Sequence, residues 1–309
     1  MLYAMSTLLD KEWHDSTRGF CRSVLGTRTA RAAARRRIAR QRSYIRRSAM
    51  IQSPRVDVDI DNGVATVTLM GEKSVNLMGR VLVGALANAL DALRRDGALR
   101  LVVLTGPRGG SFQGGVNIAE MAGFDSNSAR DFITLLHQAC HGLRALPVPS
   151  IARVEGFCLG GGMEIAAACD LRIGTQASRF GMPEVQVGLP SVIEARLLPT
   201  LIGWGNTREL LYRGHIIDAA EAHRIGFLQK LVPDADIDEG LRPWIEDIVR
   251  AEPNAIRAQK RLLENWLETA PATGIQASVD AFGATFDTDA ANRRLGAFLD
   301  RPRPKRPVE

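Results

Sequence analysis

The stretch from Gly156 to Asp170, GFCLGGGMEIAAACD, decides the fold. It follows the apolar run PSIARVE, which predicts a buried strand over 149–156. Its small apolar residues predict a short helix from Gly160 to Cys169. Glycine is used where the backbone approaches a ligand closely or takes a positive φ. The stretch therefore indicates a tight strand-to-helix turn, with the positive end of the helix dipole at a binding site.

A second glycine-rich loop, GGSFQGGVN at 109–117, follows another predicted buried strand, LVVLTG at 101–106. Neither loop is a known phosphate-binding motif, because the chain has neither G-x-x-x-x-G-K-[ST] nor G-x-G-x-x-G between a strand and a helix. Two such loops at strand ends favour two backbone N–H groups converging on one acceptor. Ordinary tight turns are the alternative interpretation.

The rest of the body has α/β character. VDVDI and VATVTL, at 56–60 and 64–69, alternate apolar and polar residues around Asp-Asn-Gly and predict a hairpin. Apolar spacing predicts helices over 79–93 and 130–146, and LRIGT at 171–175 predicts a strand. After about residue 207 the chain is expected to be largely helical. No run approaches the roughly 20 apolar residues of a membrane-spanning helix, and no signal peptide is evident.

The first 52 residues form a basic leader that we set apart from the folded body. Residues 1–49 hold one Lys and eleven Arg against three acidic residues, whereas the rest of the chain is mildly acidic. Three interpretations compete: a wrongly assigned start with Met50 as the true one, a disordered arm that touches RNA or acidic surfaces, and an organelle transit peptide. We expect a cytoplasmic protein, or an organellar one if the leader is a transit peptide; the four cysteines, without C-x-x-C spacing, fit a reducing compartment.

Two acidic residues stand in apolar surroundings. Glu164 follows the glycines within one helical turn, and Glu184 lies in the turn FGMPEV at 180–185. Acids in such places are either paired or functional. For Glu164 the structural alternative is a residue that complements the helix dipole.

Taken together, these segments resemble the enoyl-CoA hydratase/isomerase (crotonase) family over about residues 55–301. The specific segments are L-G-G-G-x-E and F-G-x-P-E, with two acids 20 residues apart. The resemblance implies a crotonase-like α/β fold of repeated β-β-α units, with a core over 53–235. It also implies a C-terminal helical region over 236–309 that assembles the chain into a homotrimer or hexamer.

The resemblance implies the site chemistry as well. The backbone N–H groups of Val116 and Gly161 would hold the thioester oxygen of an acyl-CoA, and Val116 stands where alanine is common. Glu164 would activate water and Glu184 would protonate Cα, giving a 3-hydroxyacyl-CoA from a 2-enoyl-CoA. No metal or redox cofactor is expected. The alternatives are an enoyl-CoA isomerase or another CoA-thioester enolate enzyme of the same family, and an RNA-binding hydratase-like protein that uses the leader.

Coenzyme A is expected to lie across the first glycine-rich loop and the segment 72–77, with a contribution from the C-terminus. The expected contacts are Lys73, Asn76, Leu77, Gly115, Asn117, Phe298 and Arg301. Asn117 replaces the family's usual aspartate, which orders the loop, so an amide is expected to suffice.

One segment departs from the family. Residues 188–197, GLPSVIEARL, lack the later glycines found there in many members. Val192 and Ile193 add bulk beside the acyl site and Glu194 adds an acid, so a short, branched or functionalised acyl group is compatible with it.

His137 and His141 are four residues apart on a predicted helix, a spacing that can bind metal. With no third ligand evident, a surface or partly buried pair is the favoured interpretation.

Overall fold

The computed structural model describes residues 53–299, with side chains through residue 295. The leader, the nucleic-acid hypothesis that depends on it, and Arg301 lie outside the described residues. Pro54 and the residues after it form one unit, which is described on its own. Within the described residues, no helix combines the length and the apolar character needed to cross a membrane.

The main sheet has six strands in the order β1-β2-β3-β4-β6-β9. Their bounds are β1 (Arg55–Asp61), β2 (Val64–Met70), β3 (Leu101–Thr105), β4 (Ser150–Val154), β6 (Leu171–Thr175) and β9 (Lys230–Val232). β1 and β2 form the predicted antiparallel hairpin, with positive φ at both Asn62 and Gly63. The other neighbours pair in parallel.

A second, three-stranded sheet places the two glutamates. It contains β5 (Phe157–Leu159), β7 (Arg179–Gly181) and β8 (Ile216–Asp218). β5 and β7 are parallel, and Leu159 pairs with Gly181. Glu164 follows Leu159 closely and Glu184 follows Gly181 closely, so this pairing carries both acids to the same edge of the sheet.

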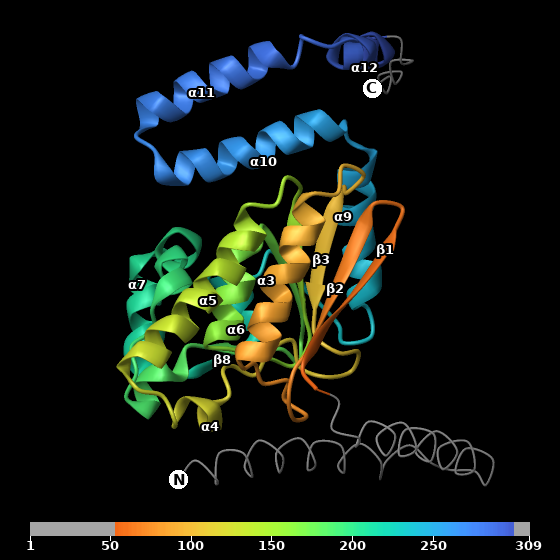
Figure 1. Ribbon diagram of the computed structural model, residues 1–309. Helices are drawn as coiled ribbons and strands as arrows, with labels where there is room; N and C mark the ends of the chain where they lie inside the picture. The colour runs from red at the N-terminus through yellow and green to blue at the C-terminus, as the bar shows by residue number, and fades with distance from the viewer. Residues whose placement is uncertain (1–52, 300–309) are drawn as a thin grey trace, which may run out of the picture. The chain divides into compact units, whose positions relative to one another are not determined.

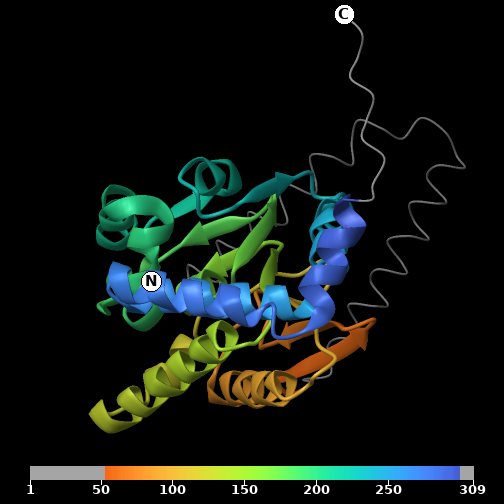
Figure 2. The ribbon, with the colours of Figure 1, turned by 90° about the horizontal axis from the view of Figure 1, so that it is seen from above.

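Helices cover both faces of the main sheet, which explains the continuous apolar runs of β3 and β4. α3 (Arg80–Arg94) and α5 (Ser126–Arg144) pack side by side (Figure 2), and α3 buries the leucines of the predicted apolar stripe. α9 (Ile237–Arg250) packs on the other face with Leu101, Ile151 and Ile173. The remaining helices of this part are α4 (Ile118–Met121), α6 (Gly161–Ala168), α7 (Leu198–Arg213) and α8 (Ala219–Arg224).

The chain beyond α9 forms a helical extension. α10 (Pro253–Glu268) and α11 (Pro271–Ala284) run antiparallel (Figure 1), and α12 (Asp289–Leu299) follows. α10 is fastened to the sheet region by Lys260 Nζ, which lies 2.7 Å from Asp170 Oδ1, and by Arg144, which binds Glu264. The expectation of a largely helical chain after residue 207 missed β8 and β9, whose three residues each are too few to show a period.

Candidate active site

The first glycine-rich loop is held in place by one buried side chain. Asn76 is 1% exposed, and its Nδ2 donates to the carbonyl groups of Leu69, Ser111 and Phe112. Asn76 has a φ of +61°, a conformation that asparagine tolerates better than most residues. The side chain of Asn76 is thus used within the protein, and so are the backbone N–H and C=O groups of Asn76 and Leu77, which bond to Lys73, Gly114 and Glu72.

Val116 and Gly161 come together at the start of α6. A methyl group built on Gly161 would lie 3.3 Å from Val116 Cγ2 and 3.1 Å from Leu136 Cδ2. In the described part of the chain, neither the N–H of Val116 nor that of Gly161 donates a hydrogen bond. Both donors therefore lie in apolar surroundings next to the positive end of the α6 dipole, where they are suited to a negative oxygen.

Position 160 accepts only glycine, because the carboxylate of Glu184 lies against it. Its φ is +53°, and a Cβ there would lie only 2.7 Å from Glu184 Oε1. Any side chain would thus be strained and would also displace the carboxylate of Glu184. The glycine that opens α6 therefore makes room for an acid from another element.

Glu164 is buried in the first turn of α6 with 4% exposure. Its Oε1 accepts a hydrogen bond from the N–H of Ala195 at 3.2 Å. Burial, followed by the negative charge of Glu184, raises the pKa of Glu164 to about 8; the charge of Glu194 adds to this and the N–H of Ala195 opposes it. At neutral pH Glu164 thus holds a proton in the free protein.

Glu184 lies in the 3₁₀ helix η1 (Pro183–Val187) and is less enclosed. Ser191 Oγ donates to Glu184 Oε2 at 2.9 Å. Burial raises the pKa of Glu184 above its usual range, while hydrogen bonds from its own backbone and from Ser191 partly offset the rise. The two acids therefore differ in environment, as a pair that divides acid and base roles requires.

The segment 188–197, which departs from the family pattern, serves both acids. It supplies Ser191 to Glu184, and through the 3₁₀ helix η2 (Ile193–Leu197) it supplies the N–H of Ala195 to Glu164. The acid expected there, Glu194, is buried, and its Oε1 lies 2.8 Å from Nδ1 of His137. Sequence reasoning missed the partners Ser191, Ala195 and His137, because no spacing signal links these residues to the acids.

The structure places the expected coenzyme A residues as follows. Lys73 is exposed in a turn with a φ of +58°, and Gly115 is buried with a φ of +103°. Asn117 caps α4 through the N–H of Ala119, and its Nδ2 donates to Glu72 Oε2 at 2.7 Å. The Asn117 amide thus orders the loop by bonding to Glu72. An aspartate at position 117 would be repelled by that carboxylate. Phe298 belongs to α12, and its side chain lies outside the described ones.

His137 and His141 do not converge on a common ligand position, because His137 is directed to Glu194. Their ring centroids are 6.2 Å apart. Over residues 53–295, no group of three or more His, Cys, Asp or Glu side chains is arranged to hold a metal ion. The described cysteines, at 140, 158 and 169, are buried and unpaired.

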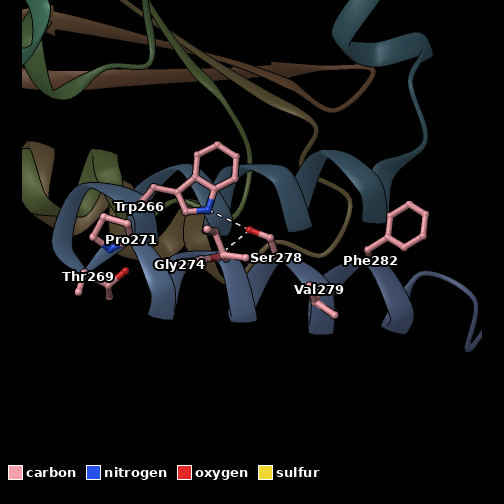
Figure 3. Close-up of a pocket in the computed structure, with 9 residues that line it drawn as sticks. Trp266, Thr269, Pro271, Gly274, Ser278, Val279 and Phe282 are labelled. Carbon is pink, nitrogen blue, oxygen red and sulfur yellow. Dashed lines mark hydrogen bonds between the residues drawn. The ribbon is translucent and has the colours of Figure 1, made fainter.

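An apolar hollow of about 610 Å³ lies elsewhere, between α10 and α11 (Figure 3). Trp266, Ile275, Val279 and Phe282 line it, and Trp266 Nε1 donates to Ser278 Oγ at 3.0 Å. Neither glutamate borders it. This hollow contains no charged side chain, so Glu164 and Glu184 remain the candidates for acid–base chemistry.

Comparisons with known proteins agree with this fold. The profile of the enoyl-CoA hydratase/isomerase family matches residues 59–306. The crotonyl-CoA hydratase of Syntrophomonas wolfei is 31% identical over 239 residues, which cover 77% of this chain and 92% of that protein. The short-chain-enoyl-CoA hydratase of Clostridium acetobutylicum is 30% identical over 247 residues, 80% of this chain and 95% of that protein.

A solved structure shows the same architecture. The enoyl-CoA hydratase of Bacillus anthracis superposes with a TM-score of 0.76 at 29% identity, over 81% of this chain and 97% of that one. The predicted crotonase fold, an α/β core with a helical C-terminal part, is confirmed. The chain belongs to the enoyl-CoA hydratase/isomerase family, and an enzyme of hydratase type is the class that fold and relatives define.

Proposed function

We propose that this protein adds water reversibly across the 2,3-double bond of a 2-enoyl-CoA and forms a 3-hydroxyacyl-CoA. The single observation that carries the proposal is the arrangement at the start of α6. There, two unpaired backbone N–H groups adjoin the buried Glu164, whose pKa is raised by burial and by the negative charge of the partly buried Glu184. Relatives named as enoyl-CoA hydratases at about 30% identity support the same reaction class.

The N–H groups of Val116 and Gly161 would bind the thioester oxygen. Polarising this carbonyl makes Cβ electrophilic and stabilises the enolate that forms once the water oxygen has bonded to Cβ. A single such donor contributes roughly 3–4 kcal/mol in other oxyanion holes. Because only backbone atoms take part, the valine side chain is compatible with the role and would narrow the acyl pocket beside it.

The two glutamates would share one proton and exchange it with the substrate. Hydration needs a base that takes a proton from water and an acid that delivers one to Cα. The resemblance assigns the base to Glu164 and the acid to Glu184. The burial of Glu164 places the shared proton on Glu164 in the free protein, so this assignment requires the proton to pass to Glu184 when substrate and water bind.

Coenzyme A would run along the first loop and the turn at 72–77, as expected from the resemblance. Lys73 is exposed there and Leu77 is half-buried, so a charged and an apolar contact are both available. We extend the proposal to Gly115 and Asn117 in the loop, and to Phe298 and Arg301 from the C-terminal region. The mechanism uses only side chains, backbone and water, with no further cofactor.

We also propose that the protein assembles as a homotrimer or hexamer through its C-terminal helices. α11 exposes Ile275, Val279 and Phe282, each by more than half. These residues are spaced by one helical turn each and thus form one apolar face. A second copy of the chain that covers this face would remove the apolar surface from water.

A turnover panel tests the hydration directly. Purified protein is mixed with short, branched and aromatic 2-enoyl-CoAs, and loss of the enoyl-thioester absorbance is followed. We expect hydration of at least one short or branched substrate, because Val116, Val192 and Ile193 add bulk. Absence of turnover throughout the panel would contradict the proposal.

A further inference from the structure

Glu194 is a third buried acid that the mechanism above does not use. It lies in η2 with 3% exposure, one residue before Ala195. Its Oε1 is bound by His137, and its Oε2 has no hydrogen-bond partner in the described part of the chain. A buried carboxylate without full pairing costs free energy of folding. If Glu194 served only to anchor η2 to His137, an uncharged acceptor would do so equally well. The charge itself therefore calls for an explanation.

Three elements converge on this acid. η2 carries Glu194, α5 carries His137 and Cys140, and α6 carries Glu164, and all three elements contact one another. The hydrogen bond between Glu194 and His137 joins η2 to α5 at 2.8 Å. The residue after Glu194 donates its N–H to Glu164 Oε1. One short 3₁₀ helix thus links the surface histidine to the buried acid of the site.

We propose that Glu194 is a positioning residue that acts through Glu164. Its bond with His137 fixes η2 and thereby holds the N–H of Ala195 on Glu164 Oε1, while its negative charge opposes loss of the proton from Glu164 in the free protein. His137, whose side chain is 50% exposed, connects this arrangement to solvent.

The two acidic neighbours of Glu164 oppose its ionisation, whereas the N–H of Ala195 favours it. Glu184 faces it from η1 and Glu194 from η2, and both raise the pKa of Glu164. From α5 the thiol of Cys140 adjoins the two acids; burial, with their negative charges, raises the pKa of this thiol well above its usual range, so it remains uncharged. His137 lies on the outer side of Glu194 and is hydrogen-bonded to it through Nδ1, and His141 stands beside His137.

The test is a titration of Glu164 in the free protein, which needs no substrate. Carboxyl-¹³C-labelled glutamate is incorporated, and the Glu164 signal is identified as the one that disappears in Glu164→Gln. In the wild type we expect a midpoint near pH 8. In Glu194→Gln, which keeps the shape and an acceptor for His137 but removes the charge, we expect the midpoint to fall by about one pH unit.

Two further variants separate the charge from mere structure. His137→Ala leaves the charge of Glu194 less compensated, so the Glu164 midpoint should rise, opposite to the effect of Glu194→Gln. His141→Gln, one turn further along α5, is the matched control and should leave the midpoint unchanged. If Glu194→Gln does not fold, the upward shift in His137→Ala decides alone. Midpoints that stay at the wild-type value in both Glu194→Gln and His137→Ala would overturn the proposal.

The kinetic consequence rests on the proposed hydratase function. If the active form of the pair holds one proton, loss of that proton from Glu164 gives the alkaline limb of kcat/KM. In Glu194→Gln this limb should move to lower pH. An inactive wild type would contradict the hydratase function and leave the titration to decide on Glu194, whereas an active enzyme with an unmoved midpoint would overturn the role of Glu194 alone.

Discussion

Among single residues, the two acids differ in their burial and in their hydrogen-bond partners. Glu164 is the more deeply buried acid and accepts from one backbone N–H. Glu184 is less enclosed and accepts from the hydroxyl group of Ser191. In the folded protein the pKa values of both acids are raised above those of an unfolded chain, so the folded state holds their protons more tightly. The contribution of these two acids to the free energy of unfolding is therefore fully present below about pH 4.5 and is lost as pH rises through the folded-state pKa values. The protein should thus be less stable at pH 8 than at pH 5.

Ser191→Ala tests the partner of Glu184. Removing the hydroxyl group removes a hydrogen bond that favours the charged form, so the pKa of Glu184 should rise further. The acidic limb of kcat/KM is expected to move to higher pH by roughly 0.5–1 unit, while the alkaline limb remains in place. Ser191→Thr, which keeps a hydroxyl group, is the control. A shift of both limbs together would contradict a specific role for Ser191.

Among elements, the attachment of α10 to the sheet depends on a buried charge. Lys260 is 3% exposed and contacts Asp170 and Glu264. Arg257, also from α10, donates to the carbonyl groups of Gly97 and Leu99. α10 is therefore joined to the core mainly by polar contacts.

Lys260→Ala should lower the free energy of unfolding by about 2 kcal/mol, because it leaves Asp170 without its cation. Removing one partner of a fully buried pair costs about 3–5 kcal/mol, and we expect less here because both acids are partly exposed. Urea unfolding at fixed protein concentration measures the change. Arg242→Ala, which breaks an exposed pair with Glu239, is the control and should change the value by less than about 0.5 kcal/mol. Equal effects of the two substitutions would show that α10 is not held by Lys260.

At the scale of the whole molecule, the apolar face of α11 should determine assembly. The double substitution Ile275→Asp with Phe282→Asp places two charges on this face and should convert the proposed trimer or hexamer to a monomer of 33.7 kDa. Sedimentation equilibrium measures the mass, which for the wild type should be three or six times that of the chain. Val81→Asp, at an exposed apolar residue on α3, is the control. A variant that remains fully oligomeric would exclude α11 from the interface.

The sequence predicted much of the core because its signals are local. The alternating hairpin around Asn62, the leucine stripe of α3 and the glycine turn before α6 each lie within about 15 residues. The closeness of Glu164 and Glu184 was inferred from the family, and the pairing of β5 with β7 now gives its structural basis.

The support around the acids could not be predicted, because it is made by contacts distant in sequence. Asn76 bonds to carbonyl groups 35 and 36 residues away, and His137 meets Glu194 across 57 residues. The burial that raises the pKa of Glu164 also depends on packing among α5, α6 and η2. Such features follow from tertiary structure, and neither motif spacing nor composition contains them.

The most direct test of the central claim compares Glu164→Gln and Glu184→Gln in one assay that follows both hydration and double-bond migration of an enoyl-CoA. If two acids share the proton work beside the amides of Val116 and Gly161, each variant should lose hydration by at least about 100-fold, and neither should gain migration. Glu164→Gln with full turnover, beside an inactive Glu184→Gln, would contradict the account and indicate a single-acid isomerase.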